Sequence, residues 1–499
     1  MKVLSNNLLK KTAWSSENPD DQFTVENPAT GEVIAIIQGG GQAEMDAAIE
    51  AANEAFETDW KHRSAEERSK LLLKCADVLE AHADEIARIE TLENGKPFSQ
   101  ARNFDVNALI ELFRYFASLV DKIPGGFIDH GHLYTSIIVE PLGVVGAIIP
   151  FNWPPIHTAG KLAPALAVGN TVVLKPGEQT PLTPMYIVEL LQTVLPPNVV
   201  NVVPGTGIVA GEALSSHPLV KKISFTGSTR AGSAILKSAS TNITPTLLEL
   251  GGKNAFVVFD DADFERVIRD ALEGGYFNQG ESCTASSRMI VQRGIYHRFV
   301  EKLAEGVKQL NVGDGMLNET HVGPLVSKAH QQRVQSYIDK GIEEGLTIAA
   351  QAALPIDAHL KEGFYIKPTL FVDVPASSAL FNEEIFGPVV TITPFDTFEE
   401  AAALANQSEY GLVCGIYTQD IEKGLRLSRL VDVGMVLMNT YNRRAHGMPF
   451  GGNKHSGFGR EHCIDTLKEF GHMKAIRFPS GLKPLTNWQA VNDIFGPSA

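Results

Sequence analysis

The sequence predicts an α/β protein built from two open-sheet domains. Short apolar runs alternate with stretches long enough to hold a helix, first between residues 144 and 225 and again after about residue 252. Alternation of this kind is typical of parallel βαβ units, whose ligand site lies at the carboxyl ends of the strands. The restart predicts a second α/β domain, with a boundary near residues 249–253. The runs are residues 144–149, 171–174, 199–203 and 222–225 in the first domain, and residues 255–259, 389–393 and 413–417 in the second.

The N-terminal region is predicted to hold strands followed by two or three helices. Residues 27–32, with the sequence NPATGE, have the composition of a turn between two strands. Ser64, followed three positions later by Glu67, forms a capping box that predicts the start of a helix. Apolar residues then recur at helical spacing from Leu71 to Ile86, which supports that helix.

The bulk composition limits the kinds of partner that the chain can have. Its 499 residues are 44 % apolar and 20 % charged, which is ordinary for a soluble globular protein of two or three domains. The formal net charge of −15 would repel a phosphate backbone unless a basic patch compensated for it. The lysine pairs at residues 10–11 and 221–222 are isolated, so no nucleic-acid partner is expected.

Cysteine usage and the N-terminal sequence predict a cytoplasmic location. The four cysteines are widely separated, which fits free thiols in a reducing compartment. Neither they nor the 14 histidines show the spacing of metal ligands, so no metal is expected. The N-terminus has no apolar core followed by a cleavage site, and the longest apolar run, residues 142–151, is half the length of a membrane helix. We therefore expect no membrane partner.

Three segments are candidates for nucleotide binding. Residues 225–232, FTGSTRAG, follow an apolar run and open a helical stretch, where backbone N–H groups could hold a phosphate. Their spacing differs from G-x-G-x-x-G, and a capped helix explains them equally well. Residues 203–207, VPGTG, are a weaker candidate of the same kind. Lys175 and Glu178 follow a predicted strand, where a carboxylate could hold a ribose diol, although the pair could also be a surface turn.

Cys283 is the candidate nucleophile of the chain. It ends the segment FNQGESC, residues 277–283, in which glycine and small polar residues precede the thiol. A thiolate can attack an electrophilic carbon, and a carboxylate such as Glu249, from the separate segment 248–254, can later activate water against the resulting thioester. Taken alone, a single cysteine is more often a small buried core residue than a nucleophile.

Seven segments give the chain a resemblance to the NAD(P)-dependent aldehyde dehydrogenase superfamily. The match occurs in the family's order and runs from residues 26–31, ENPATG, to residues 457–461, GFGRE. It implies an aldehyde dehydrogenase-like α/β fold, with two Rossmann-like open-sheet domains and a small bridging β-element. The segments are PFNWP at 150–154, KPGE at 175–178, FTGS at 225–228, LELGGK at 248–253, GESC at 280–283, EIFGP at 384–388 and PFGG at 449–452.

The resemblance also implies how the chain is divided and assembled. Residues 1–121 and 141–251 would form the NAD-binding domain, and residues 252–452 the catalytic domain. Residues 122–140 and 467–487 would make a bridging, oligomerisation sheet between subunits. A homo-oligomer is therefore expected, either a dimer or a dimer of dimers.

The implied activity is the oxidation of an aldehyde by NAD and water to a carboxylic acid and NADH. Cys283 would be the nucleophile. Asn152 would donate its side-chain amide to the oxygen that becomes negative, beside the backbone N–H of Cys283. Glu249 would activate the water that hydrolyses the thioester, and Lys161 and Glu461 would support proton movement around this base.

NAD is the cofactor that the resemblance implies. Lys175 and Glu178 would contact the adenosine ribose, and Glu178 favours NAD over NADP because its charge would lie near a 2′-phosphate. Ser228 and nearby glycines would approach the pyrophosphate, and Glu384 would hold the nicotinamide ribose. Phe386 could instead be a plain core residue, and a glycine a plain turn. The implied cofactor residues are Ile148, Lys175, Glu178, Gly207, Phe225, Gly227, Ser228, Leu250, Glu384 and Phe386.

The substrate stays open between two classes of aldehyde. Arg443, Arg444 and His157 could bind an anionic or hydrogen-bonding tail, or the arginines could face solvent or a neighbouring subunit. Aromatic side chains in the same region would equally suit aromatic or medium-chain aldehydes. The implied substrate pocket comprises Phe151, Trp153, His157, Phe277, Ser282, Thr284, Asn442, Arg444 and Phe450.

Two other functions compete with this one. A CoA-acylating relative would release the acyl group to CoA, but a water-activating base such as Glu249 has no use there. A non-catalytic relative would be expected to lack Cys283, Asn152 or Glu249, and all three are present. Glu281, where many relatives have glutamine, lies outside the reacting set.

Overall fold

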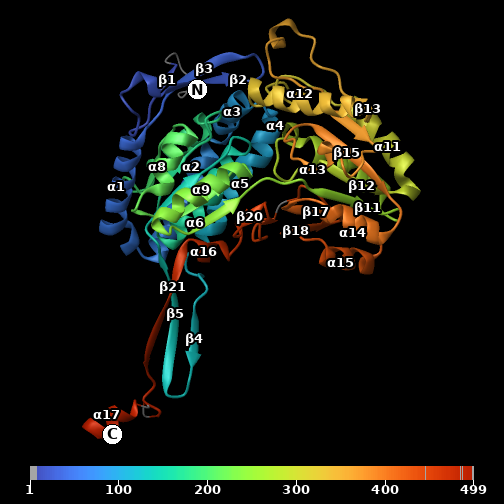
Figure 1. The fold of residues 1–499 in the computed structure, drawn as a ribbon. Helices are drawn as coiled ribbons and strands as arrows, with labels where there is room; N and C mark the ends of the chain where they lie inside the picture. The colour runs from blue at the N-terminus through green and yellow to red at the C-terminus, as the bar shows by residue number, and fades with distance from the viewer. Residues whose placement is uncertain (1–7, 444, 484, 486, 497–499) are drawn as a thin grey trace.

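The computed structural model describes residues 8–443, 445–483, 485 and 487–496. Figure 1 shows two α/β lobes side by side, with a narrow arm projecting from one of them. The first lobe is built on a six-stranded sheet and the second lobe on a seven-stranded sheet. The α/β class and the two open-sheet domains predicted from the sequence are confirmed.

The sheet of the first lobe is parallel except for one edge strand. Its members are β6 (Val144–Ile148), β7 (Thr171–Lys175), β8 (Val200–Val202), β9 (Val220–Thr226), β10 (Thr246–Glu249) and β20 (Gly457–Phe458). The strand order is β20-β10-β9-β6-β7-β8, and β20 runs antiparallel to β10. All four apolar runs predicted for this domain are strands.

Helices cover both faces of this sheet. They are α1 (Gln42–Thr58), α2 (Ala65–Ala81), α3 (Ala83–Asn94), α4 (Phe98–Gln100), α5 (Asn107–Ala117), α6 (Pro154–Val168), α7 (Leu182–Gln192), α8 (Glu212–Ser216) and α9 (Thr229–Ala239). Helices α2, α3, α5, α6 and α7 share one apolar core with the sheet, and α1, α8 and α9 share the other. Helix α2 begins at the predicted capping box, where Ser64 Oγ accepts from the N–H of Glu67 at 3.2 Å.

The second lobe repeats this layered arrangement. Its strands are β11 (Ala255–Val258), β12 (Arg288–Gln292), β13 (Thr347–Gln351), β14 (Thr369–Val372), β15 (Val389–Phe395), β17 (Val413–Tyr417) and β18 (Met435–Met438). Their order is β13-β14-β15-β12-β11-β17-β18, with only β13 antiparallel to its neighbour. The three predicted runs became β11, β15 and β17. The other four strands of the sheet were not predicted.

The second sheet also lies between helices. These are α10 (Phe264–Tyr276), α11 (Arg293–Lys308), α12 (Lys328–Glu343), α13 (Ala379–Asn382), α14 (Phe398–Asn406) and α15 (Ile421–Leu430). Helices α10 and α11 pack on one core, whereas α12 to α15 contribute to two others. Strand β10 ends at Glu249 and β11 begins at Ala255, so the chain crosses between the lobes where the restart was predicted.

The C-terminal part of the chain returns to the first lobe after completing the second. Strand β20 pairs Gly457 with Glu249 and Phe458 with Leu248 of β10. A Cβ on Gly457 would lie 2.0 Å from the carbonyl oxygen of Leu248, so only glycine permits this pairing. The return lies just beyond residue 452, the predicted end of the catalytic domain, and it closes the edge of the first sheet next to Glu249.

The arm is a three-stranded antiparallel sheet that lies away from both lobes (Figure 1). Its strands are β4 (Gly126–Asp129), β5 (Leu133–Pro141) and β21 (Gly471–Pro479). The long pairing of β5 with β21 runs from Pro141 opposite Gly471 to Leu133 opposite Pro479. These strands fall almost entirely within the predicted bridging segments, of which residues 484 and 486 lie outside the described residues. Exposed apolar side chains on the arm include Phe127, Ile128, Met473, Ile476 and Phe478.

Smaller elements complete the described chain. At the N-terminus, β2 and β3 form the hairpin whose turn was predicted at residues 27–32. The remaining elements are β1 (Leu9–Lys10), β2 (Gln22–Asn27), β3 (Glu32–Gln38), β16 (Tyr410–Gly411), β19 (Asn453–Lys454), α16 (Thr466–Glu469) and α17 (Gln489–Phe495). In the part of the chain that the structure describes, every helix is too short or too polar to cross a membrane. That part also holds no group of three or more His, Cys, Asp or Glu side chains placed to bind a metal ion.

Candidate active site

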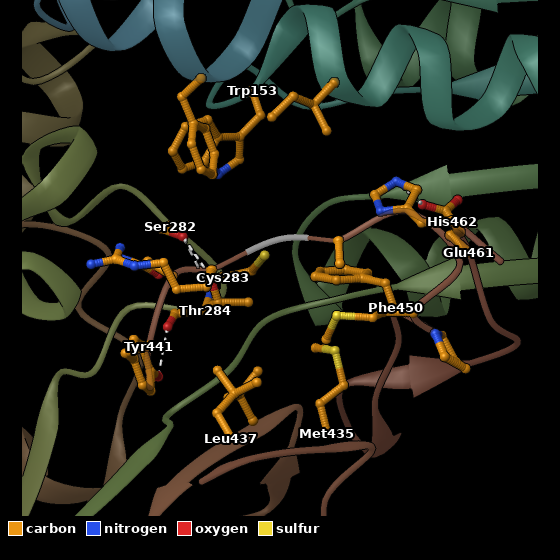
Figure 2. Close-up of a pocket in the computed structure, with 18 of the residues that line it drawn as sticks. Trp153, Ser282, Cys283, Thr284, Met435, Leu437, Tyr441, Phe450, Glu461 and His462 are labelled. Atoms are coloured by element: carbon orange, nitrogen blue, oxygen red, sulfur yellow. Dashed lines mark hydrogen bonds and ion pairs between the residues drawn. The ribbon is translucent and has the colours of Figure 1, made fainter. Parts of the chain in front are cut away.

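The candidate nucleophile Cys283 lies in a pocket lined by both lobes. Helices α5 and α6 of the first lobe contribute Leu112 and Ile156, and the second lobe contributes Cys283 and Leu437. Figure 2 shows the Cys283 side chain reaching toward the interior of the pocket, with Trp153 on one side and Leu437 on the other. A thiol at this place could meet a small molecule that enters between the lobes.

Asn254 fixes the backbone around Cys283. Its Nδ2 donates to the carbonyl oxygens of Cys283 at 2.7 Å and of Ala285 at 2.9 Å, and its Oδ1 accepts from the N–H of Val413 at 3.1 Å. Gly252 permits this close packing, because a Cβ there would lie 2.6 Å from the Cys283 carbonyl oxygen. The segment that joins the two sheets therefore holds the thiol in place.

The Cys283 thiol is protonated at neutral pH in this environment. Burial raises its pKa to about 12, and the carboxylates of Glu384 and Glu249 add to the rise. Because the thiolate is the nucleophilic form, attack on a carbonyl requires the loss of this proton. The site therefore needs a neighbouring base that can accept the thiol proton.

Asn152 is held through both its side chain and its backbone. Its Nδ2 donates to the carbonyl oxygen of Glu281 at 3.1 Å. Its own carbonyl oxygen accepts from Asn278 Nδ2 at 3.1 Å and from Lys96 Nζ at 2.9 Å. Asn278 Nδ2 also donates to the Glu281 carbonyl, at 3.0 Å, from a left-handed backbone with a φ of 53° that asparagine adopts more readily than most residues. These bonds hold the Asn152 amide against the loop that carries Cys283.

Lys96 anchors this arrangement from a fully buried position. Its Nζ lies 2.7 Å from Glu90, also contacts Asp105, and stands 4.2 Å from the centre of the Trp153 ring system. Burial lowers the pKa of Lys96, but Asp105 and Glu90 outweigh it and raise the pKa overall. Burial and the charge of Asp105 raise the pKa of Glu90, which therefore tends to keep its proton. Asp105 then balances the charge of Lys96, and the Lys96 ammonium group donates to the Asn152 carbonyl oxygen.

Glu249 lies buried at the end of β10. Neither of its carboxylate oxygens has a hydrogen-bond partner within the described ranges. Gly451 leaves room for the carboxylate, because a Cβ there would lie 2.7 Å from Glu249 Oε1. Burial raises the pKa of Glu249 well above its ordinary value, and the charge of Glu461 adds to the rise. Glu461 in turn accepts from Lys161 Nζ at 2.8 Å, so the structure brings together all three residues predicted around the base.

Several predicted cofactor residues lie at the carboxyl ends of the first lobe's strands. Lys175 ends β7 opposite Ile148 of β6, and Gly227 and Ser228 follow β9. Ser228 Oγ accepts from the N–H of Ala231 at 3.2 Å and so caps α9. The interpretation of this segment as the start of a capped helix is therefore correct. Phosphate could still bind to the free N–H groups at the same helix start.

Glu178 and Gly207 are in direct contact. The N–H of Gly207 donates to Glu178 Oε1 at 2.7 Å, and Lys175 Nζ lies 3.7 Å from the same oxygen. A Cβ on Gly207 would meet only this oxygen, at 3.8 Å, so the backbone there is open to close approach. A carboxylate beside an open glycine at the strand ends fits the ribose and pyrophosphate of a dinucleotide.

Glu384 reaches the junction between the lobes from the second lobe. Its Oε1 accepts from the N–H of Gly252 at 2.9 Å, and a Cβ on Gly251 would lie 2.4 Å from its Oε2. Burial raises the pKa of Glu384. Of the three remaining predicted cofactor residues, Phe225 and Leu250 are buried in the core of the first lobe.

The structure places Phe151 outside the substrate pocket for which it was predicted. Its ring packs edge-on against Phe386, with ring centres 5.7 Å apart, and against His330 at 5.8 Å. Phe386 has a left-handed φ of 60°, and its carbonyl oxygen lies 2.7 Å from His330 Nε2. Phe151 follows β6 by three positions, and its ring packs against Phe386 and His330, whereas Trp153, two positions later, lines the pocket.

The other described residues predicted for the substrate pocket do line it. A stacked pair of aromatic side chains, Trp153 and Phe277, forms one wall, with ring centres 5.9 Å apart and planes inclined by 23°. Arg444 lies outside the described residues. The predicted residues that line the pocket are Trp153, His157, Phe277, Ser282, Thr284, Asn442 and Phe450.

Arg443 is already neutralised within the protein. Its Nη2 donates to Glu273 Oε2 at 3.1 Å, and the same nitrogen lies 3.6 Å from Asp270 Oδ1. Two carboxylates on α10 therefore compete with any anionic substrate tail. Arg443 therefore does not support the hypothesis that the pocket binds a substrate with an anionic tail.

Several residues of the site were missed from the sequence. Lys96 and Asn278 act through backbone carbonyls, which leave no mark in a sequence, although Asn278 lies within the segment that drew attention to Cys283. His462 could have been predicted as a site residue, because it directly follows Glu461 in the sequence. The other lining residues missed are Phe104, Leu112, Ile156, Gly274, Val413, Met435, Leu437, Tyr441 and Met448.

The fold and the site together define an α/β protein with a thiol-centred pocket beside a dinucleotide-type sheet. A family model described as the aldehyde dehydrogenase family matches residues 14–476. The chain is 53 % identical over 481 residues to an aldehyde dehydrogenase of Didymella fabae, which covers 96 % of this chain and 97 % of that protein. It is 52 % identical over 481 residues to aldehyde dehydrogenase citD of Monascus ruber, with 96 % of each chain covered.

Solved structures agree with these relatives. An NAD+ complex of an aldehyde dehydrogenase from Bacillus cereus superposes with a TM-score of 0.89 at 40 % identity, covering 92 % of this chain and 93 % of that one. PnpE from Pseudomonas sp. WBC-3 gives a TM-score of 0.90 at 39 % identity, covering 94 % and 96 %. The chain therefore belongs to the aldehyde dehydrogenase family.

Replacing Asn278 by glycine is expected to lower kcat for aldehyde oxidation. Glycine keeps the left-handed backbone but removes the amide that donates to the carbonyls of Asn152 and Glu281. Loss of such a buried bond costs about 1–3 kcal/mol, which corresponds to roughly a tenfold loss or more if it displaces the Asn152 amide. The control is Gln279→Gly, at a neighbouring left-handed position whose amide does not reach Asn152. Equal kcat losses in the two variants, measured by steady-state kinetics, would contradict this role.

Proposed function

We propose that the protein oxidises an aldehyde to the carboxylic acid through a covalent bond to Cys283, with NAD as cofactor. The observation that carries this proposal is the placement of the Cys283 thiol in the pocket with the Asn152 amide fixed against the same loop. An amide nitrogen carries two hydrogens, and the bond to Glu281 uses one of them. The second is available to an oxygen bound at the thiol.

In the first step the Cys283 sulfur attacks the aldehyde carbon, and the thiol proton passes to a base. The carbonyl oxygen gains negative charge and accepts from Asn152 Nδ2 and from the backbone N–H of Cys283. One such donor typically contributes about 3 kcal/mol of transition-state stabilisation. Bound NAD would supply the hydride acceptor that turns the adduct into a thioester.

In the second step Glu249 takes a proton from water as that water attacks the thioester carbon. The raised pKa of Glu249 suits this role, because a carboxylate with a higher pKa is a stronger base toward water. The C–S bond then breaks to release the acid, and the sulfur takes up the proton that Glu249 had accepted from water. The hydrogen-bonded pair of Lys161 and Glu461 beside the base offers a route for its proton.

Two competing functions remain less well supported. Release of the acyl group to CoA would leave Glu249, buried beside the thiol and raising its pKa, without a function. A binding protein without activity would have no need for the costly burial of Glu249 without hydrogen-bond partners.

NAD is proposed because the residues at the strand ends suit it and because the Bacillus cereus relative was solved as an NAD+ complex. Lys175, Glu178, Gly207 and Ser228 would hold its adenosine half. Glu384 would hold the nicotinamide ribose. We further propose that the arm joins copies of the chain into a dimer or a dimer of dimers, because its exposed apolar side chains would then be covered.

Cys283→Ser is expected to abolish turnover while leaving NAD binding intact. Serine keeps the shape of the side chain but is a much weaker nucleophile without a dedicated base. NADH formation with a panel of aldehydes measures turnover, and calorimetry measures NAD binding. The acid product should form at the same rate with and without CoA. A variant that retains wild-type turnover, or an acyl-CoA product, would contradict the proposal.

Glu461→Gln is expected to shift the pH profile of thioester hydrolysis to lower pH. The carboxylate of Glu461 raises the pKa of Glu249, so its removal lowers that pKa and makes the base available at lower pH. Because the base acts when deprotonated, the rate should rise with pH in both proteins, with an earlier midpoint in the variant. The steady-state rate of NADH formation that follows the first-turnover burst contains the hydrolysis step, and measuring it by stopped flow from pH 5 to pH 9 tests this shift.

Glu178→Gln is expected to improve the use of NADP relative to NAD. The amide can still accept a ribose hydroxyl, but it no longer repels a 2′-phosphate. Two charges about 4 Å apart at a protein surface interact by roughly 1–4 kcal/mol, so the ratio of kcat/KM values should change by about tenfold or more. An unchanged ratio, or equal efficiency of the wild type with both cofactors, would show that Glu178 does not set this preference.

A further inference from the structure

Helix α12 is bonded to the loop that carries Glu384 and Phe386. This loop joins α13 to β15. Arg333 of α12 donates from Nη2 to the carbonyl oxygen of Glu384 and from Nη1 to that of Ile385, both at 2.6 Å. His330 lies one turn earlier on the helix, and its Nε2 is 2.7 Å from the carbonyl oxygen of Phe386. Three successive carbonyl oxygens of the loop therefore meet one face of α12.

His330 is the donor in its bond to Phe386. A carbonyl oxygen can only accept, so Nε2 must carry the hydrogen. Burial lowers the pKa of His330 to about 4, which keeps the ring neutral at neutral pH. At the start of the helix, Ser327 Oγ accepts from the backbone N–H of His330 at 3.2 Å. The imidazole is therefore a neutral donor on a fixed backbone.

The loop is also packed tightly against both α12 and the segment that carries Cys283. A Cβ on Gly387 would lie 2.8 Å from the methyl carbons of Val334 on α12. A Cβ on Gly280 would in turn lie 2.4 Å from the Gly387 carbonyl oxygen. Gly280 stands three positions before Cys283, so the position of the loop bears on the position of the thiol.

Phe386 adopts a backbone conformation that needs support. Its φ of 60° lies in the left-handed region, which a residue with a bulky side chain rarely adopts. Such strain persists only where the surrounding structure fixes it, and it occurs most often at functional sites. Here the His330 bond fixes the Phe386 carbonyl, and the Phe386 ring packs against the rings of Phe151 and His330.

Glu384 is held at both its backbone and its side chain. Arg333 binds its carbonyl oxygen from α12, and its Oε1 accepts from the N–H of Gly252 at the junction between the lobes. A guanidinium presents several N–H groups in a rigid fork, so one arginine can hold two neighbouring carbonyls at once. Arg333 therefore helps to fix where the Glu384 carboxylate stands along the junction.

We propose that Arg333 and His330 are positioning residues, which act through the loop to hold Glu384 and Phe386 where they meet the nicotinamide half of NAD. This inference rests on the proposed role of Glu384 in holding the nicotinamide ribose. Arg333 and His330 need not touch the cofactor in order to act. The adenosine half would be held by residues of the first lobe, so its binding should not depend on α12.

The first test compares the binding of NAD and ADP to the full chain by calorimetry. ADP keeps the adenosine and both phosphates but lacks the nicotinamide riboside, so the wild type should bind NAD more tightly. Arg333→Met should weaken NAD binding about tenfold, as expected for the loss of a charge-assisted hydrogen bond, and should leave ADP binding within about twofold of wild type. Weaker ADP binding by the same factor would overturn the inference, because Arg333 would then contact the phosphates directly.

His330→Gln and His330→Leu form a matched pair for the second positioning residue. Glutamine keeps an N–H donor, so the ratio of NAD affinity to ADP affinity should stay close to that of the wild type. Leucine has no donor, and the ratio should fall about tenfold. Equal ratios in the two variants would overturn the role of the Nε2 donor.

A double-mutant cycle tests whether Arg333 acts through Glu384. Glu384→Gln alone should weaken NAD binding. Adding Arg333→Met to that variant should weaken it little further, because the group that Arg333 positions has already been altered. Losses that simply add would overturn the inference.

Gln331→Leu is the control on the same helix. Gln331 Nε2 donates to the carbonyl oxygen of Tyr365, at 2.5 Å, and so supports a different part of the chain. This variant should bind NAD and ADP as the wild type does. A loss of NAD binding equal to that of Arg333→Met would show a general effect of disturbing α12 and would overturn the specific role of Arg333.

A kinetic measurement separates this inference from the proposed oxidation. With saturating NAD and benzaldehyde deuterated at the aldehyde carbon, Arg333→Met should lower kcat about tenfold and show a primary isotope effect, because a displaced hydride acceptor slows that step. A lower kcat without an isotope effect would contradict the inference. If the wild type shows the binding differences but no turnover, the inference is sustained and only the proposed oxidation fails. Equal binding of NAD and ADP by the wild type would overturn the role of Glu384, and this inference with it.

Discussion

The hydrogen bonds that meet at the Glu281 carbonyl oxygen are the constraint on which the site depends. Asn152 reaches this oxygen from the first lobe, and Asn278 reaches it from within the same loop. A carbonyl oxygen has two lone pairs and can accept both bonds. Because the Asn152 bond crosses between the lobes, the relative position of the two sheets decides whether the amide stands beside Cys283. This contact therefore fixes the positions of the pocket, the thiol and the strand ends of the first lobe relative to one another.

The site also concentrates ionisable groups away from water, and this burial costs stability. Burial raises the pKa of Glu281 to about 8, and that of Glu93, which accepts from the N–H groups of Leu182 and Thr183, also to about 8. Such acids bind protons more tightly in the folded chain than in the unfolded chain, so their contribution to stability declines as pH rises from about 4.5 toward 8. The same physical cause raises the pKa of Glu249, which is the water-activating base of the proposed mechanism. Burial therefore both lowers the stability of the fold and raises the pKa of the proposed base.

Much of this arrangement could be predicted from the sequence, because strand ends in a parallel sheet gather at one edge. Cys283 and Glu249 were candidates from their residue types, and their roles were implied by the resemblance of seven ordered segments to a known family. Lys96 and Asn278 were not, because they act on backbone carbonyls of residues far away in the sequence, and only the folded chain brings those groups together. Phe151 was misplaced because adjacent residues after a strand can face opposite sides, and the sequence does not say which.

Strand β20 has a consequence for how the chain is made. The edge of the first sheet is supplied by Gly457 and Phe458, about two hundred residues after β10 leaves the ribosome. Domains generally fold as they emerge during synthesis, N-terminal parts first. Here the nascent first lobe must wait with an open strand edge while the whole second lobe is translated. An exposed edge is a template for wrong pairing, so synthesis itself is the interval in which this protein is most exposed to aggregation.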